Sequence, residues 1–165
     1  MNAYLRTAMS TRPTFTIRPA VPADAARVTI LLVAQLREHE IPTDETHVAS
    51  SVAAMLADPG RGFILVADGA EIIEGVAYVS FATPLEHAGE VAWLEELYVA
   101  PAQRNHGIGQ ALVDAVIEQA GARGCVSVDL EVEADHARAA NLYERSGFRR
   151  MRRSHWVRPL ARWDW

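Results

Sequence analysis

The stretch Leu94–Gln110, LEELYVAPAQRNHGIGQ, decides the fold that we expect for this chain. Its first half reads as a β-strand that runs to Val99 and is stopped at Pro101. Its second half places Gly107 and Gly109 directly before an apolar helical run. A glycine loop between a strand and a helix gathers free backbone N–H groups at the positive end of the helix, which favours an anion. A tight structural turn explains the same pattern equally well, so other features must decide.

The bulk composition predicts one globular domain. The 165 residues suffice for a single hydrophobic core, and we expect a loose tail at residues 1–13 and one domain at residues 14–165. No apolar run is long enough to cross a bilayer, and the N-terminus lacks the apolar segment of a secretory signal, so we expect no membrane partner. The single Cys125 favours a reducing compartment, and a cytoplasmic location is expected.

The charged residues exclude several functions. All sixteen Lys and Arg positions are arginine, which rules out a lysine Schiff base and a standard phosphate-binding loop with lysine. Residues 1–137 carry a net charge of −11, and residues 138–165 carry +6. An acidic body favours small cationic partners over nucleic acid, although a merely solvated acidic surface reads the same way. No His, Cys and acidic residues have the spacing of metal ligands, so we expect no metal.

Hydrophobic periodicity and turn residues predict the remaining elements. We expect strands at residues 15–18, 62–67, 72–81, 90–99, 124–133 and 148–159, and helices at residues 22–40, 43–56, 107–122 and 135–146. This order predicts an α/β fold with a mixed central sheet of six to seven strands and about four helices.

Two blocks of the sequence resemble a known family. The run Leu94–Gly109 resembles motif A of the GNAT superfamily of N-acetyltransferases, in which a strand ending L-Y-V-x-P is followed by R-x-x-G-x-G. The block Leu130–Phe148 resembles motif B, commonly L-x-V…N-x-x-A-x-x-L-Y-x-x-x-G-F, and the element order agrees over about residues 14–159. The resemblance implies a GNAT-like fold and a glycine loop that cradles the pyrophosphate of acetyl-CoA.

The resemblance also implies which residues bind the cofactor. The strand backbone at Leu97, Tyr98 and Val99 would hold the pantetheine arm and polarise the acetyl carbonyl. The pyrophosphate loop would consist of Arg104, Asn105, His106, Gly107, Ile108, Gly109 and Gln110. His136 stands where the family usually has asparagine, which leaves a cofactor contact there open, and Asn141 is the substitute amide nearby.

Two residues are candidates for catalysis. Tyr143 falls on the tyrosine that often protonates the departing thiolate in this family; the alternative is that it only packs the helix on the sheet. Glu95 and Glu96 are expected to point to opposite faces of their strand, and Glu95 is favoured as the base that deprotonates the amine. A raised pKa from burial and from the neighbouring carboxylate would suit that role; the alternative is an ion-paired surface carboxylate.

The sequence therefore predicts an acetyl-CoA-dependent N-acetyltransferase. The amine of a small cationic molecule would attack the thioester directly in a ternary complex. Two alternatives stay open: a non-catalytic acyl-CoA-binding regulatory module, and a protein N-acetyltransferase with an open peptide groove. Neither the acceptor amine nor the formation of a homodimer is decided by the sequence.

Overall fold

A five-stranded sheet organises the part of the chain that the structure, a computed structural model, describes: residues 15–133 and 136–160. The strands follow one another in sequence order, the first four antiparallel and the last pair parallel. The strands are β1 (Thr16–Pro19), β2 (Gly62–Asp68), β3 (Ile73–Ala82), β4 (Val91–Val99) and β5 (Ser127–Leu130). The α-helices are α1 (Ala25–Glu38), α2 (Glu45–Ala57), α3 (Ile108–Arg123) and α4 (Ala137–Arg145).

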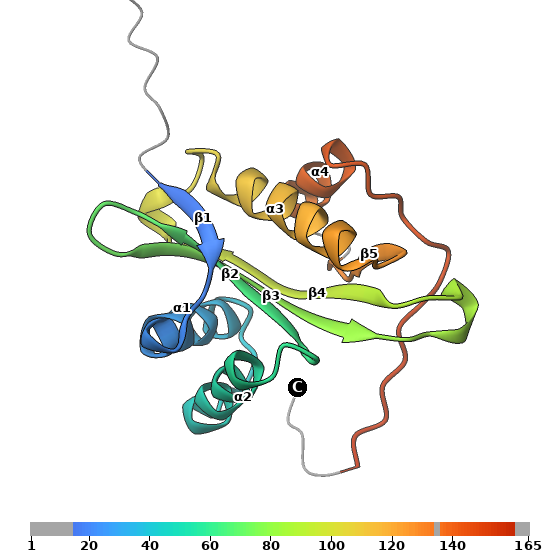
Figure 1. Cartoon of the computed structure of the whole chain (residues 1–165), viewed down its shortest axis with the longest axis horizontal. Helices are drawn as coiled ribbons and strands as arrows, with labels where there is room; N and C mark the ends of the chain where they lie inside the picture. The colour runs from blue at the N-terminus through green and yellow to red at the C-terminus, as the bar shows by residue number, and fades with distance from the viewer. Residues whose placement is uncertain (1–14, 134–135, 161–165) are drawn as a thin grey trace, which may run out of the picture.

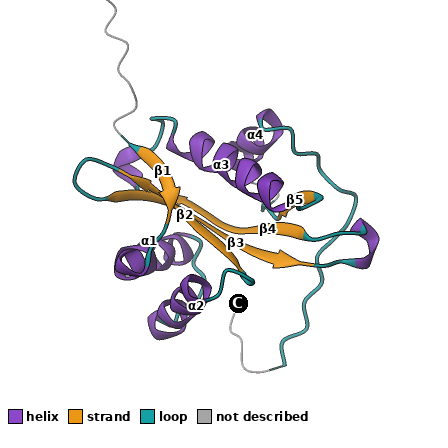
Figure 2. Cartoon of the chain, in the orientation of Figure 1, coloured by secondary structure: helices purple, strands orange, loops and turns teal. Residues whose placement is uncertain are grey.

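The helices form two layers around the sheet. In Figure 1, α1 and α2 lie below the sheet and α3 and α4 lie above it, and Figure 2 shows the same layers by element type. Each face buries its own apolar cluster: Val28, Leu31 and Val52 pack on the α1 side, whereas Leu112 and Val116 pack on the α3 side. None of the described helices is both long enough and apolar enough to cross a membrane.

A β-bulge interrupts the middle of β4. Tyr78 of β3 pairs with Glu96, but the next residue, Val79, pairs with Leu94, so Glu95 is the extra residue of the bulge. The expected unbroken alternation through Glu95 and Glu96 is therefore wrong.

The bulge changes which side chains face each helix layer. Ala92 and Leu94 precede it and lie in the α3-side cluster, and Leu97 and Val99 pack against that same cluster after it. Tyr98 accordingly lies in the α1-side cluster. Side chains two apart share a face, so Glu96 also points toward α1.

Strands β4 and β5 separate halfway along β4. Their pairing ends at Leu94 and Leu130, although β4 continues to Val99. The N–H of Ala100 bonds the carbonyl of Glu74 on the β3 side, at 2.8 Å. Because backbone groups alternate sides along a strand, the N–H and C=O groups of Leu97 and Val99 point away from β3, into the opening between β4 and β5.

The C-terminal region differs from the prediction. The described chain has five strands rather than six to seven, and the strand expected at residues 148–159 is absent from the described part of the molecule, where residues 149–160 are exposed and irregular. The strand expected at residues 124–133 is also shorter, because only Ser127–Leu130 finds a partner in β4. The tail expected at residues 1–13 and the start of the last helix at Asp135 lie outside the described residues.

Candidate active site

The glycine loop forms a left-handed entry into α3. Asn105 and Gly107 both have positive φ, 69° and 86°, and Gly107 is the residue directly before the helix. The N–H groups of Ile108, Gly109 and Gln110 come before the helical bonding pattern begins, so they have no acceptor within the helix. A side chain added at Gly107 would meet nothing within 4 Å. The space beside the Cα of Gly107 is therefore open.

Gly109 lies between α4 and β4. A Cβ there would lie 3.7 Å from Leu142 of α4 and 3.9 Å from Val99 of β4, which are ordinary van der Waals distances. The packing of the protein itself therefore does not require glycine at this position. The side chain of Gln110 bonds Asp114 at 2.9 Å and Ser146 at 2.8 Å, which ties α3 to α4 and leaves only its backbone for a ligand.

Arg104 is held by the protein itself. Both of its terminal nitrogens donate to Glu38 of α1, at 2.9 and 2.6 Å, and its Nε donates to the carbonyl of Val99 at 3.0 Å. Its guanidinium also lies over the ring of Tyr98, 5.3 Å from the centroid. This arginine therefore joins α1, β4 and the loop, and its charge is neutralised by Glu38.

A second arginine approaches the loop from the other side. Arg138, in the first turn of α4, donates to the Oδ1 of Asn105 at 2.8 Å. It is exposed and has the length to reach an anion at the loop, as has the exposed His106. The motifs gave no sign of Arg138; the charge reversal near residue 138 was the only signal that could have pointed to it.

Glu96 is the most perturbed carboxyl group of the described chain. It is mostly buried, and the Nε2 of Gln35 on α1 donates to its Oε2 at 2.5 Å. Burial, together with the neighbouring charge of Glu95, raises the pKa of Glu96 to about 7. A carboxyl group with this pKa can take up and release a proton at neutral pH.

Glu95, the favoured base of the sequence analysis, lies on the bulge with an exposed side chain. The expectation that burial would act on Glu95 is wrong, because the Glu95 side chain is exposed, whereas the bulge turns Glu96 toward α1. The charge of Glu95 still acts on the site, since it raises the pKa of both Glu96 and Tyr78.

Tyr143 approaches from the opposite helix layer. It lies on α4 and packs against the α3-side cluster, with its ring edge-on to Phe148 at a centroid distance of 5.6 Å. Burial and the charge of Glu96 raise its pKa to about 12, so the phenol stays protonated at neutral pH. The hydroxyl forms no hydrogen bond within the described ranges. The charge of Glu96 thus acts on Tyr143 although the two residues face opposite helix layers.

Two histidines stand beside the opening between β4 and β5. His39 follows the end of α1, and its ring lies 5.6 Å from that of His136, the residue before α4. Its charge, when present, would lower the pKa of Glu96. Asn141, the substitute amide, is exposed on α4 and has no hydrogen-bond partner among residues 15–133 and 136–160.

Gln35 is a residue of this site that was not expected from the motifs. The apolar stripe of α1 consists of Val28, Leu31, Leu32 and Leu36. Gln35 falls at the same helical spacing and is buried with them, at 9% exposed, although it is polar. A polar residue inside an apolar stripe was the available signal.

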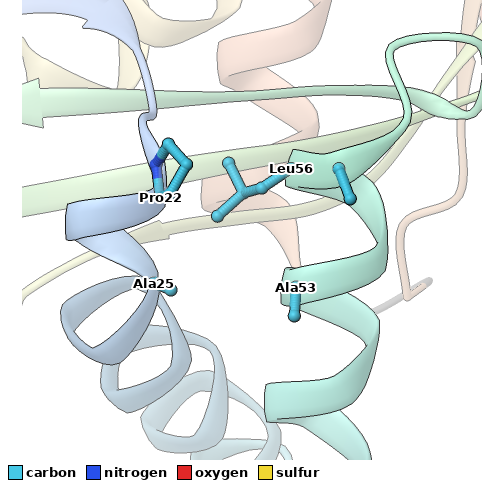
Figure 3. Close-up of a pocket in the computed structure, with 5 residues that line it drawn as sticks. Pro22, Ala25, Ala53 and Leu56 are labelled. Carbon is cyan, nitrogen blue, oxygen red and sulfur yellow. The ribbon is translucent and has the colours of Figure 1, made fainter.

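A separate apolar hollow is unrelated to this chemistry. Figure 3 shows it between the start of α1 and the end of α2. Its volume is about 220 Å³. Pro22, Ala25, Ala53, Leu56 and Ala57 line it, and none of them can transfer a proton.

Comparison with known proteins identifies the family. The sequence pattern of the acetyltransferase (GNAT) family matches residues 30–148, most of the chain. The chain belongs to the GNAT family of acetyltransferases. It is similar to the aminoglycoside N(6')-acetyltransferase type 1 of Klebsiella aerogenes, with 27% identity over 134 residues that cover 80% of this chain and 88% of that one.

Solved structures agree with this assignment. A protein from Arthrobacter sp. FB24 has a TM-score of 0.75 and 32% identity, over 88% of this chain and 96% of that one. An aminoglycoside N-acetyltransferase in complex with CoA shares the fold, with a TM-score of 0.75 and 16% identity over 89% and 95% of the two chains. GNAT acetyltransferases use acetyl-CoA, so this chain is an acetyl-CoA-dependent N-acetyltransferase.

The residues present fit this donor. The opening beside Gly107 and the free N–H groups at the start of α3 suit a pyrophosphate. The N–H groups of Leu97 and Val99 and the carbonyl of Leu97, which point away from β3, suit the amide groups of a pantetheine arm, whereas the Val99 carbonyl already accepts from Arg104.

Proposed function

We propose that this GNAT acetyltransferase moves the acetyl group of acetyl-CoA onto the primary amine of a small cationic molecule, by direct attack of the amine nitrogen. Acetyl-CoA supplies the acetyl group as a thioester. The observation that carries the proposal is that Glu96, bonded from α1, and Tyr143, packed in the opposite helix layer, lie near enough for the charge of Glu96 to raise the pKa of Tyr143.

Glu96 acts as the base in this proposal. An ammonium group cannot attack until it loses a proton, and a carboxylate with a pKa of about 7 can accept that proton at neutral pH. The N–H bond of the ammonium breaks, an O–H bond forms on Glu96, and the freed lone pair attacks the thioester carbon.

The strand backbone and Tyr143 serve the other half of the reaction. An N–H of Leu97 or Val99, facing the opening, would stabilise the negative charge that develops on the acetyl oxygen. The phenol of Tyr143, protonated because its pKa is about 12, would give its proton to the sulfur as the carbon–sulfur bond breaks.

The charges at the opening support a cationic acceptor. Glu95 is exposed on the bulge, and its charge acts on the neighbouring Glu96. Two adjacent carboxyl groups of this kind attract a molecule with several amines. The Klebsiella relative is named for an aminoglycoside, which is a molecule of this kind.

Acetyl transfer to a panel of amines tests the proposal. Aminoglycosides, diamines, amino acids and short peptides are each incubated with acetyl-CoA, and released thiol and acetylated product are measured together. We expect amine-dependent thiol release with at least one small polyamine, a strong loss in Glu96→Gln, and no loss in Glu118→Gln on the exposed side of α3. Acetylation of peptides alone would contradict the small-molecule assignment.

A further inference from the structure

Gln35 carries a polar group that the reaction described so far does not use. Its Nε2 donates to Glu96 at 2.5 Å, but its Oε1 is fully buried and has no partner. Only two buried side-chain polar atoms of the described chain are unpaired, this oxygen and the Nδ1 of His87. A buried acceptor without a partner is destabilising, and such atoms are rare in folded proteins.

The geometry of an amide suggests what the oxygen is for. An amide presents a donor and an acceptor side by side in one plane, and a carboxylic acid presents the matching acceptor and donor. A carboxylate can use only the donor of the amide. Once the carboxylate takes up a proton, its new O–H can donate to the amide oxygen. The Oε1 of Gln35, which has no partner while Glu96 is ionised, therefore gains one when Glu96 is protonated.

We propose that Gln35 is a positioning residue that holds Glu96 in both of its protonation states, its Nε2 bonding the carboxylate and its Oε1 accepting the O–H of the acid formed when Glu96 takes a proton from the amine. The inference rests on the proposed role of Glu96 as the base. The step breaks an N–H bond of the ammonium and forms an O–H bond on Glu96, with no oxidation or reduction.

The other groups around Glu96 do not replace Gln35. His39 at the end of α1 and Glu95 on β4 change the pKa of Glu96 through their charge. The charge of Glu96 in turn raises the pKa of Tyr143 on α4. Gln35 is the only hydrogen-bond partner of the Glu96 carboxyl group among the described residues. Its place on α1, one helix packed directly on β4, fixes the direction of that carboxyl group.

The variant Gln35→Met tests the inference, because methionine has a similar length and removes both the donor and the acceptor. A donor to a charged group is worth more than an acceptor to a neutral one, so loss of both should raise the pKa of Glu96 by roughly one unit. Carbon-detected NMR of labelled glutamate side chains measures this pKa without any turnover. The low-pH limb of kcat/KM should move upward by the same amount.

Thr29→Val is the matched control on the same helix. The Thr29 hydroxyl bonds only the carbonyl of Ala25, at 2.8 Å, so its loss should leave the Glu96 titration and the pH profile unchanged. Circular dichroism confirms that both variants fold; if Gln35→Met does not, Gln35→Leu takes its place.

The outcomes separate this inference from the proposed function. An unchanged Glu96 titration in a folded Gln35→Met variant would overturn the role of Gln35, whatever the activity. A shifted titration in a protein whose wild type acetylates no amine would instead overturn the proposed function and the amine as the source of the proton. A shift of equal size in Thr29→Val would show that the effect is not specific to Gln35.

Discussion

The buried carboxyl group of Glu96 destabilises the folded chain at neutral pH. Its pKa rises from an ordinary 4.5 to about 7, so between these values the folded state keeps a proton that the unfolded state has released. Stability therefore falls as pH rises through this window. Glu96→Gln should raise the free energy of unfolding at pH 8 by up to about 3 kcal/mol, and by little at pH 4.

Urea unfolding of wild type and Glu96→Gln at pH 4 and pH 8 measures this difference. Glu95→Gln is the matched control, because its side chain is exposed and it sits on the neighbouring residue. An equal gain from Glu95→Gln, or no dependence on pH, would show that Glu96 is not the desolvated carboxyl group.

Tyr143 offers a second prediction at the scale of one residue. Tyr143→Phe keeps the ring and its edge contact with Phe148 but removes the proton. Turnover should fall by roughly 10²- to 10⁴-fold, the usual contribution of a general acid, with unchanged affinity for acetyl-CoA. Rapid-mix kinetics with one confirmed amine isolates the chemical step, and unchanged chemistry would leave Tyr143 a packing residue.

The start of α3 depends on the backbone of one glycine. Gly107 has a φ of 86°, which strains any residue with a side chain, so Gly107→Ala should destabilise the fold by about 1–2 kcal/mol. The same change should weaken acetyl-CoA binding, because the N–H groups at the helix start lose their arrangement. Gly121→Ala, in the last turn of the same helix with open space around it, should instead stabilise by up to about 0.5–1 kcal/mol.

Calorimetry with acetyl-CoA and thermal unfolding of both glycine variants test this contrast. Wild-type affinity in a destabilised Gly107→Ala variant would make the loop a structural turn and not a pyrophosphate site. Weakened binding in Gly121→Ala would show that the effect comes from the helix as a whole.

Two arginines contact the loop, and they should contribute differently. Arg104 is engaged with Glu38 and with the carbonyl of Val99, so Arg104→Gln should cost on the order of 1 kcal/mol of stability and lower acetyl-CoA affinity only slightly. Among the described residues the Arg138 side chain bonds only Asn105, so Arg138→Gln should lower acetyl-CoA affinity more and reduce its dependence on salt. Titrations of both variants with acetyl-CoA at low and high salt compare the two losses of affinity. A larger loss in Arg104→Gln than in Arg138→Gln would show that Arg104, and not Arg138, binds the pyrophosphate.

Across the whole molecule, local pattern predicted most of the architecture. Periodicity and turn residues predicted the four helices and the first four strands. Each of these elements buries an apolar stripe or face, and the spacing of its apolar residues is visible in the sequence. The prediction of a strand at residues 148–159 is wrong. This segment carries several arginines, β5 is short, and the segment finds no strand partner among the described residues. A strand depends on a partner that sequence pattern does not show.

The candidate site was less predictable for the same reason. The glycine loop and Tyr143 lie in motifs, so their positions could be read along the chain. That Glu96, and not Glu95, is the buried carboxyl group depends on a β-bulge, and this bulge arises only from the pairing of β4 with β3. Gln35 comes to Glu96 from a helix 61 residues earlier, a contact that no local pattern contains.

The dependence of kcat/KM on pH, measured with one confirmed amine for wild type, Glu96→Gln and Glu95→Gln, tests the central claim most directly. Wild type should show a limb near pH 7, where Glu96 loses its proton. Glu96→Gln should lose this limb and recover only at high pH, where the amine arrives already neutral. Glu95→Gln should keep the limb and move it to lower pH, because the Glu95 charge that raises the Glu96 pKa is gone. A wild-type profile in Glu96→Gln, or loss of the limb in Glu95→Gln alone, would contradict the account.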